Sequence, residues 1–348
     1  NRFTVLYLEF AFMQHLTQLT VLGNDWRSPH ASVLELPFDM LMAYLREVHQ
    51  AHHSGMLVMN GRRMKAVTGD ITLATALTSL NLDNNDIDLL TPDFADLFYL
   101  SHLSLRKNLI ATLPWEFGGL ASLSHMDLGH NKIQEMPGVV GTLSSLKVLL
   151  LDHNGLSKLP NSIGELVKLE RLGLEYNELM VIPGTIAHLT SLTFLDCSHN
   201  NLRLLPLYIG SLGSLQELYA TTNQLYSLPE SIGQCSQLHT LALSNNFISV
   251  IPVSIQYLTS LTHLGVSNNS IKVLPPVMSQ NELLVNFDFD NNPILDPPQL
   301  VLDKGFEQVM IYLKKMYDVT FTGHLDLRDL LLPDLPADLL GAQGSPED

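Results

Sequence analysis

The chain has 348 residues, of which 46% are hydrophobic, and its formal net charge of −16 comes from 19 basic and 35 acidic residues. A field of that sign repels phosphate groups, which disfavours binding to nucleic acids or to anionic membrane surfaces. Two cysteines cannot build a disulfide framework, and no apolar run approaches the roughly 18 residues that a membrane-spanning helix needs. The composition therefore predicts a protein of the cytoplasm, without insertion into a membrane.

One asparagine recurs along most of the chain, each time after the frame L-x-x-L-x-L-x-x-N, as in "LASLSHMDLGHN". A proline follows it by six residues, and nine of the 18 prolines occupy this slot. A fixed period of this kind is typical of repeat proteins, which grow as one array instead of folding into separate globular domains. The asparagines stand 23 residues apart, at Asn85, Asn108, Asn131, Asn154, Asn177, Asn200, Asn223, Asn246, Asn269 and Asn292.

Each frame predicts one short strand, x-L-x-L, which pairs in parallel with the strand of the next repeat about 4.8 Å away. The leucines point into a shared core, and the chain must then turn away, burying backbone amides and carbonyls. Each such group costs about 1–3 kcal/mol if it is left unpaired. An asparagine side chain both donates and accepts hydrogen bonds, so stacked asparagines can satisfy these turns as a ladder. The proline suits the first position of a short α or 3-10 turn on the opposite side.

The repeats "LPNSIGELVKLERLGLEYNEL" and "LPESIGQCSQLHTLALSNNFI" resemble the leucine-rich repeat family, in its 23-residue intracellular type. They look like those of Ras-suppressor and Ras-scaffold proteins and of plant Ras-group proteins. The resemblance implies an α/β solenoid, a horseshoe with a parallel concave sheet and short convex 3-10 or α segments. It also implies a protein partner, such as a small GTPase or a phosphatase subunit, bound on the concave face.

The register predicts the domain organisation from the amino terminus onward. The frame "LTQLTVLGN" ends at Asn24 and also fits from Asn1, so residues 1–24 are expected to end an upstream array. The chain is accordingly expected to be a fragment of a longer protein. The next slot, at Arg62, comes 38 residues after Asn24, and the insertion contains helical spacing in "FDMLMAYLREV". Residues 25–54 are therefore expected to form a helical junction.

Residues 55–298 are expected to form the main array, of about ten repeats. A second long repeat follows Asn292 and aligns without gaps with the first at an offset of 268, with "FEQVMIYLKKM" in the helical part. Two interpretations stay open for residues 299–318: a second junction to another array, or a capping helix that covers the last core layer. Residues 319–348 are expected to be a partial repeat, with Pro336 in its slot, and a polar tail.

Side chains at the x positions of the strands, and those just after them, are expected to face the concave surface. Aromatic residues beside an arginine are the usual composition of a binding hot spot, and they cluster in the middle of the chain. We call this set the central patch and expect it to bind the partner. It comprises Leu150, Arg171, Glu175, Tyr176, Phe194, Asp196, His199, Glu217 and Tyr219.

The histidines raise the question of a metal site. His102 and His125 occupy equivalent slots in adjacent repeats, as do His130 and His153, so each pair is expected to stack. The two pairs lie about 16 Å apart along the strand direction and cannot share one ion. Two imidazoles alone make a poor zinc site, so neither these pairs nor the run "HQAHHSG" predicts a metal. No phosphate-binding glycine loop and no nucleophile–base arrangement is found, so no cofactor and no enzyme activity is predicted.

Three functions remain open on the sequence alone. The first is a non-catalytic scaffold whose acidic surface binds a partner with a basic face. The second is the recognition arm of a larger signalling enzyme, such as a kinase, cyclase, phosphatase or Roco-type GTPase. The third is a structural subunit of a large assembly, for example a ciliary complex.

Overall fold

The computed structural model describes residues 3–21, 24, 26, 28, 29, 31–67, 69–325, 328 and 330. These form two compact units, residues 1–202 and 203–348, which are described separately. Asn1, Pro336 and most of the tail predicted after residue 325 lie outside the described residues. Within the described part, no helix has the length and apolar character needed to cross a bilayer.

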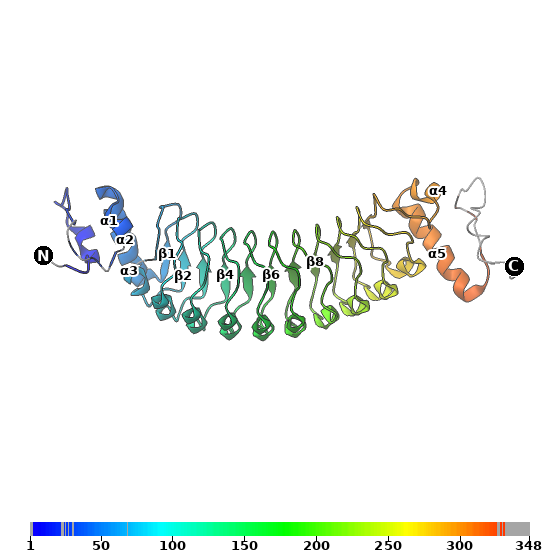
Figure 1. The fold of residues 1–348 in the computed structure, drawn as a ribbon, viewed down its shortest axis with the longest axis horizontal. Coiled ribbons are helices and arrows are strands. Elements are labelled where there is room, and N and C mark those ends of the chain that lie inside the picture. The colour runs from blue at the N-terminus through cyan, green and yellow to red at the C-terminus, as the bar shows by residue number, and fades with distance from the viewer. Residues whose placement is uncertain are drawn as a thin grey trace. The chain divides into compact units, whose positions relative to one another are not determined.

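The described part of the first unit contains an N-terminal segment, three α-helices, short 3-10 turns and seven parallel strands, each paired with its neighbours in sequence (Figure 1). Leucine pairs with leucine or methionine in consecutive strands, as in Leu149↔Leu172, so the apolar x-L-x-L positions stack in register. The elements are η1 Leu8–Phe12, α1 Ala31–Leu34, α2 Phe38–Ser54, β1 Met56–Val58, α3 Gly69–Thr72, β2 Ser79–Asn81, η2 Pro92–Asp96, β3 His102–Ser104, η3 Trp115–Gly119, β4 His125–Asp127, η4 Gly138–Thr142, β5 Val148–Leu150, η5 Asn161–Glu165, β6 Arg171–Gly173, η6 Gly184–His188 and β7 Phe194–Asp196.

The second unit repeats the same coil and ends in a second pair of helices. Its strands are also parallel and in register, with Leu241↔Leu264 as an example. The elements are η7 Ile209–Ser211, β8 Glu217–Tyr219, η8 Glu230–Gln234, β9 Thr240–Ala242, η9 Val253–Tyr257, β10 His263–Gly265, η10 Pro276–Gln280, β11 Asn286–Asp288, α4 Gln299–Leu302 and α5 Phe306–Thr322. The prediction of an α/β solenoid with parallel strands, short 3-10 turns and two inserted helical segments is confirmed.

The asparagine side chains hold the coils together from inside. Asn177 is buried; its amide nitrogen donates to the carbonyls of Leu151, Leu174 and Glu175, and its Oδ1 accepts from the amide of Leu156 at 3.0 Å. The same pattern recurs in neighbouring repeats, for example at Asn200. One side chain thus bonds to backbone groups of two coils, because the slot lies where the chain leaves the strand.

Both cysteines lie in the core, as their places in the repeat predict. Cys197 fills a leucine slot of a strand end and Cys235 caps η8, and both are fully buried. Burial raises the pKa of Cys235 to about 11, so its thiol stays protonated at neutral pH.

Candidate functional site

The face of the sheet that carries the x positions is exposed, and in the first unit it presents a cation–π pair. The guanidinium carbon of Arg171 lies 3.4 Å from the ring centroid of Phe194 on the next strand. Phe194 is half-buried, whereas Leu195 beside it is fully buried, so the two point to opposite faces. Arginine and phenylalanine therefore cover one another on the outer face, within the predicted central patch.

The rest of the central patch in the first unit surrounds this pair. The side chain of Leu150 covers Gly173. A Cβ added at Gly173 would lie 3.1 Å from Cδ2 of Leu150. Burial, and then the nearby charge of Asp196, raise the pKa of Glu175. The patch thus contains one carboxylate, that of Glu175, that holds its proton more tightly.

Glu217 and Tyr219 belong to the second unit, in β8. The hydroxyl of Tyr219 donates to Oε2 of Glu217 at 2.8 Å. The two side chains therefore lie together on the outer face of that strand. Their place in a partner-binding surface stays a prediction.

Four rings stack on one another just beyond the carboxyl ends of successive strands in the first unit. We call them the ring stack: His130, His153, Tyr176 and His199. Their centroids are 4.0, 4.2 and 4.0 Å apart in that order, with interplanar angles of 9–13°. The sequence predicted only the first pair. The signal for the whole stack is an aromatic residue in the slot before the asparagine in four successive repeats.

The backbone explains why these rings align. In the described repeats from Asn85 to Asn292, the residue before the asparagine has a positive φ, from 52° at His153 to 59° at Asn245. This left-handed conformation turns all the side chains of the column in the same direction. The column contains Asn84, Lys107, His130, His153, Tyr176, His199, Thr222, Asn245, Asn268 and Asn291, and Gly61 takes the same place before the slot at Arg62.

Beside the ring stack, Arg106 forms an ion pair that the sequence did not reveal. Its two terminal nitrogens donate to the two carboxylate oxygens of Asp152, at 2.9 and 2.8 Å, and one lies 3.5 Å from Asp127. Arg106 reaches over Gly129, where a Cβ would collide with its Nη1. Hydrogen bonding to Asp152 raises the pKa of Arg106 further, and burial raises that of Asp127.

Among the described residues, His130, Asp152 and His153 form one group with three potential metal ligands, whose ligand atoms lie within 4.8 Å of one another. Nε2 of His130 is 3.7 Å from Oδ2 of Asp152. However, both oxygens of Asp152 already accept hydrogen bonds from Arg106. The lone pairs of parallel stacked rings also do not converge on one point. The geometry therefore favours an ion-pair network over a metal site.

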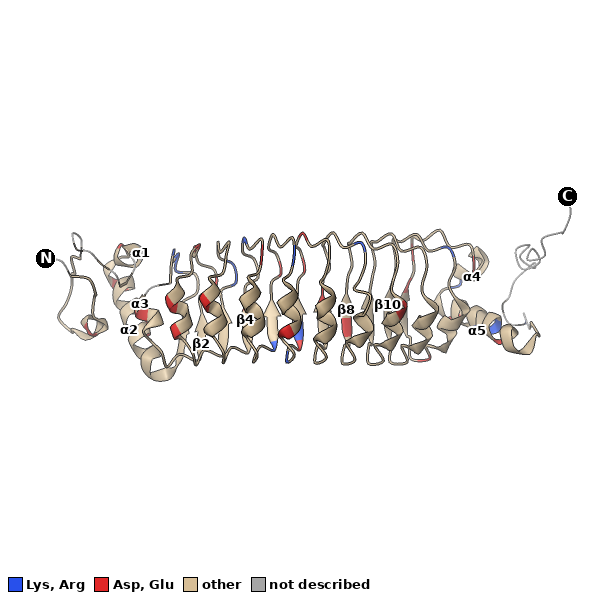
Figure 2. Cartoon of the chain, turned by 60° about the horizontal axis from the view of Figure 1, so that its bottom comes forward, with Lys and Arg blue, Asp and Glu red and all other residues tan. Residues whose placement is uncertain are grey.

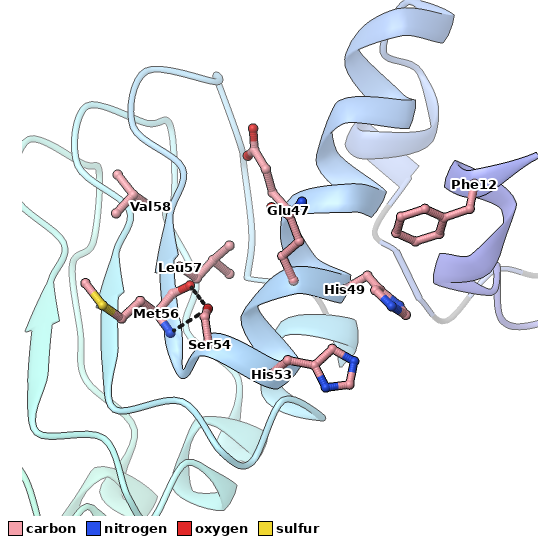
Figure 3. A pocket seen from close by; sticks show the side chains of 9 residues that line it. Phe12, Glu47, His49, His53, Ser54, Met56, Leu57 and Val58 are labelled. Atoms are coloured by element: carbon pink, nitrogen blue, oxygen red, sulfur yellow. Dashed lines mark hydrogen bonds between the residues drawn. The ribbon is translucent and has the colours of Figure 1, made fainter. Parts of the chain in front are cut away.

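The histidines of α2 do not converge on a common ligand position either. Figure 3 shows His49 pointing toward Phe12, with which it makes an edge contact at 4.7 Å, and Glu47 pointing away from His49 and His53. These side chains line a cavity of about 650 Å³ between η1, α2 and β1. His52 instead lies 3.4 Å from the carbonyl of Asp70.

The second histidine pair, His102 and His125, stacks on the outer face with centroids 4.4 Å apart, as expected from the sequence. The hydroxyl of Ser124 donates to the carbonyl of Ser101 at 2.9 Å, so it must accept from Nδ1 of His125, 2.8 Å away. Ser101 and His102 repeat this arrangement. This bonding pattern favours the tautomer with the proton on Nδ1, which leaves Nε2 as an acceptor, and both rings line a groove of about 270 Å³.

His125 makes the stability of the fold depend on pH. Burial, and then the charge of His102, lower the pKa of His125 below 6.5; Glu170 raises it and Lys147 lowers it, and these two pair with each other at 2.8 Å. As the pH falls through about 6.5, the unfolded chain therefore takes up this proton first. We expect the free energy of unfolding to decrease between about pH 7.5 and 5.5.

Replacement of His125 by Gln should make that decrease smaller, as measured by urea unfolding at several pH values. The raised pKa values of Asp127 and Glu175 instead make the free energy of unfolding increase as the pH falls, but at lower pH. Both residues are present in the parent and in the variant. Equal pH dependence in the parent and in His125→Gln would contradict this assignment.

Comparison with known proteins agrees with the fold. The model of a leucine-rich repeat region matches residues 138–227, and the model of the leucine rich repeat matches residues 75–133 and 213–271. No curated protein sequence matches the chain. The coil, the asparagine ladder and these matches together show that the chain is a member of the leucine-rich repeat family.

Several solved structures share this fold. An LRR protein of Leptospira interrogans is 29% identical with a TM-score of 0.65, and the match covers 72% of this chain and 71% of that one. The plant peptide hormone receptor RGFR1, in complex with RGF2, is 27% identical with a TM-score of 0.60, covering 68% and 44%. Toll in complex with Spatzle, from Drosophila, is 24% identical with a TM-score of 0.63, covering 72% and 35%. The chain thus spans less than half the length of RGFR1 and of Toll in these structures.

Proposed function

We propose that the chain is a non-catalytic scaffold that binds a partner protein on the outer face of its sheet. Leucine-rich repeat proteins are generally protein-interaction scaffolds, and the two receptor structures above are complexes. The observation that carries the proposal is the Arg171–Phe194 pair, a preformed cation–π contact on an exposed strand face. Because both side chains are already ordered by each other, a partner that covers them loses little conformational entropy.

The charges favour a partner with a basic face. Acidic residues are spread over the repeats together with basic ones (Figure 2), and over the whole chain they outnumber them 35 to 19. Near the cation–π pair, Glu175 and Asp196 are close enough for their charges to interact. The Nε2 acceptors of His102 and His125 add further positions for donors such as lysine or arginine side chains. Small GTPases and phosphatase subunits stay proposals that rest on the resemblance, as does the cytoplasm as location.

The central patch is tested by replacing Arg171, Tyr176 and Phe194 together with Ala. We expect affinity purification from the native source to recover at least about tenfold less of the partner, since aromatic and arginine hot spots contribute most of the binding energy. The partner's retention should also weaken between about 0.15 and 0.5 M salt if its face is basic.

The control replaces the exposed residues Val167, Met180 and Val181, which lie away from the strands, with Ala. Both variants should keep the circular dichroism spectrum of the parent. Undiminished recovery with the Arg171, Tyr176 and Phe194 variant would place the binding surface elsewhere. Equal losses in both variants would mean that the assay does not report on the patch.

A further inference from the structure

The two helical segments are structural copies of each other. Elements η1, α1 and α2 begin at residues 8, 31 and 38. Elements η10, α4 and α5 begin at residues 276, 299 and 306, which is 268 residues later in each case. Helices α2 and α5 both have 17 residues and both end at a glycine of left-handed conformation, Gly55 and Gly323.

The coil that precedes each helix is copied as well. A parallel bridge joins Val5 to Ser28 in the first unit, and its counterpart joins Val273 to Asp296 in the second. In both, the amide of the following leucine donates to the carbonyl of the bridge residue at 2.9 Å. Each helix packs against the 3-10 turn of the coil before it, α2 against η1 and α5 against η10.

In the first unit, a new coil covers the other side of the helix. Helix α2 lies between η1 and β1 (Figure 1), and it also contacts α3, because the hydroxyl of Tyr44 donates to Oδ2 of the buried Asp70 at 2.6 Å. As a result, Val48 and Ala51 in the second half of α2 are fully buried, and Leu57 of β1 is 3% exposed.

In the second unit, the side of α5 that faces the preceding coil is packed against it, as in α2. Val309 and Leu313 are buried, and the hydroxyl of Tyr312 donates to Oδ1 of Asp296 at 2.7 Å. This tyrosine bonds to the preceding coil instead of the following one, because Asp296 stands where the first copy has Ser28.

The other side of α5 is open among the described residues. Met316 and Val319, the counterparts of Val48 and Ala51, are only half-buried. Leu325, the counterpart of Leu57, is 37% exposed, and Phe321 is 74% exposed. A helix that only ended an array would present polar residues on this side. On α5 this side instead carries apolar residues, as it does on α2.

We propose that this open face of α5 seats a further leucine-rich coil, formed by this chain's own residues 326–348. At the offset of 268, Leu335, Asp338 and Leu339 take the places of Val67, Asp70 and Ile71, of which Ile71 is fully buried. Among the described residues, the chain beyond α5 returns to the start of this helical segment. Leu330 is fully buried, and Nζ of Lys304, just after α4, donates to its carbonyl at 2.9 Å. Helix α5 is thus a junction and not a terminal cap.

Hydrogen–deuterium exchange on the full chain tests the proposal, with Leu339→Asp as the variant. Because the counterpart of Leu339 is buried, we expect the amides of residues 316–323 to exchange about tenfold faster or more in this variant. Leu331→Asp is the matched control, since its counterpart, Arg63, is exposed, and it should leave the exchange unchanged.

Unchanged exchange in Leu339→Asp, or equal acceleration in both variants, would overturn the proposal. So would exchange of residues 331–348 at the rate of an unstructured chain. If a second copy of the protein covered α5 instead, protection would depend on protein concentration, which also overturns it.

A disulfide test uses the contact of His52 with Asp70, whose counterparts are Thr320 and Asp338. The pair Thr320→Cys and Asp338→Cys should oxidise to an intramolecular disulfide, detected by mass spectrometry. The control pair joins Asp338→Cys to Lys314→Cys, because Arg46, the counterpart of Lys314, contacts the preceding coil. The native cysteines are fully buried and do not interfere. Equal oxidation of the two pairs would contradict the docked coil. This test does not depend on the proposed partner.

Discussion

Replacing Asn177 with Ala should lower the free energy of unfolding by about 3 kcal/mol, since it removes one side chain that serves four backbone groups. The carbonyls of Leu151, Leu174 and Glu175 each lose a donor, and the amide of Leu156 loses its acceptor. These groups lie inside the solenoid, where water reaches them only if the coils separate. Urea unfolding followed by circular dichroism measures the change.

Asn161→Ala is the control, because Asn161 is exposed at the start of η5. It should change the free energy of unfolding by less than about 0.5 kcal/mol, as expected for a surface position. A loss of similar size in both variants would show that the ladder is not what stabilises the turn. Exchange of the Leu156 amide should also become faster in Asn177→Ala alone.

Replacing Gly164 with Ala should cost about 3 kcal/mol, since the added methyl group meets the backbone of the next coil and not a flexible side chain. Its Cβ would collide with the carbonyl oxygen of Thr185 and lie 2.8 Å from the Cβ of Thr185. Coils η5 and η6 would have to move apart, which would weaken the core layer between them. Thermal and urea unfolding both report this loss.

Gly184→Ala is the matched control on the neighbouring 3-10 turn. No atom lies within 4 Å of a Cβ at Gly184, so this change should be neutral or slightly stabilising. A later repeat has Gln256 in the position of Gly164. A coil can therefore accept a side chain there if the next coil lies far enough away. A neutral result at Gly164 would mean that this spacing adjusts freely throughout.

The strands, the 3-10 turns and the inward positions were predictable because they depend on a local, repeated pattern. The frame around Asn177 determines its own strand, and the same frame in the next repeat determines the neighbour. The stacking of His130 on His153 could be foreseen for the same reason. The ion pair of Arg106 with Asp152 could not, because it joins residues 46 positions apart and exists only because Gly129 leaves room between them.

The exposed surface was less predictable than the core. Sequence spacing placed Arg171 and Phe194 on one face, but not the 3.4 Å contact between them, which depends on the rotamers of both side chains. The protonated nitrogen of His125 follows only once the bond from Ser124 to a backbone carbonyl is known. The helical segments allowed two interpretations, and the exposure of Met316 and Val319 relative to their copies favours one of them.

The column of positive φ angles has a consequence for how the protein can diversify. Ten non-glycine residues of five different types adopt nearly the same left-handed conformation, which would cost an isolated non-glycine residue about 1–2 kcal/mol. The backbone conformation at this position is therefore set by the surrounding coils and not by the identity of the residue. Substitutions along this edge can change charge, aromaticity or hydrogen bonding while the chain path stays the same. New specificities can thus arise one repeat at a time without a new fold.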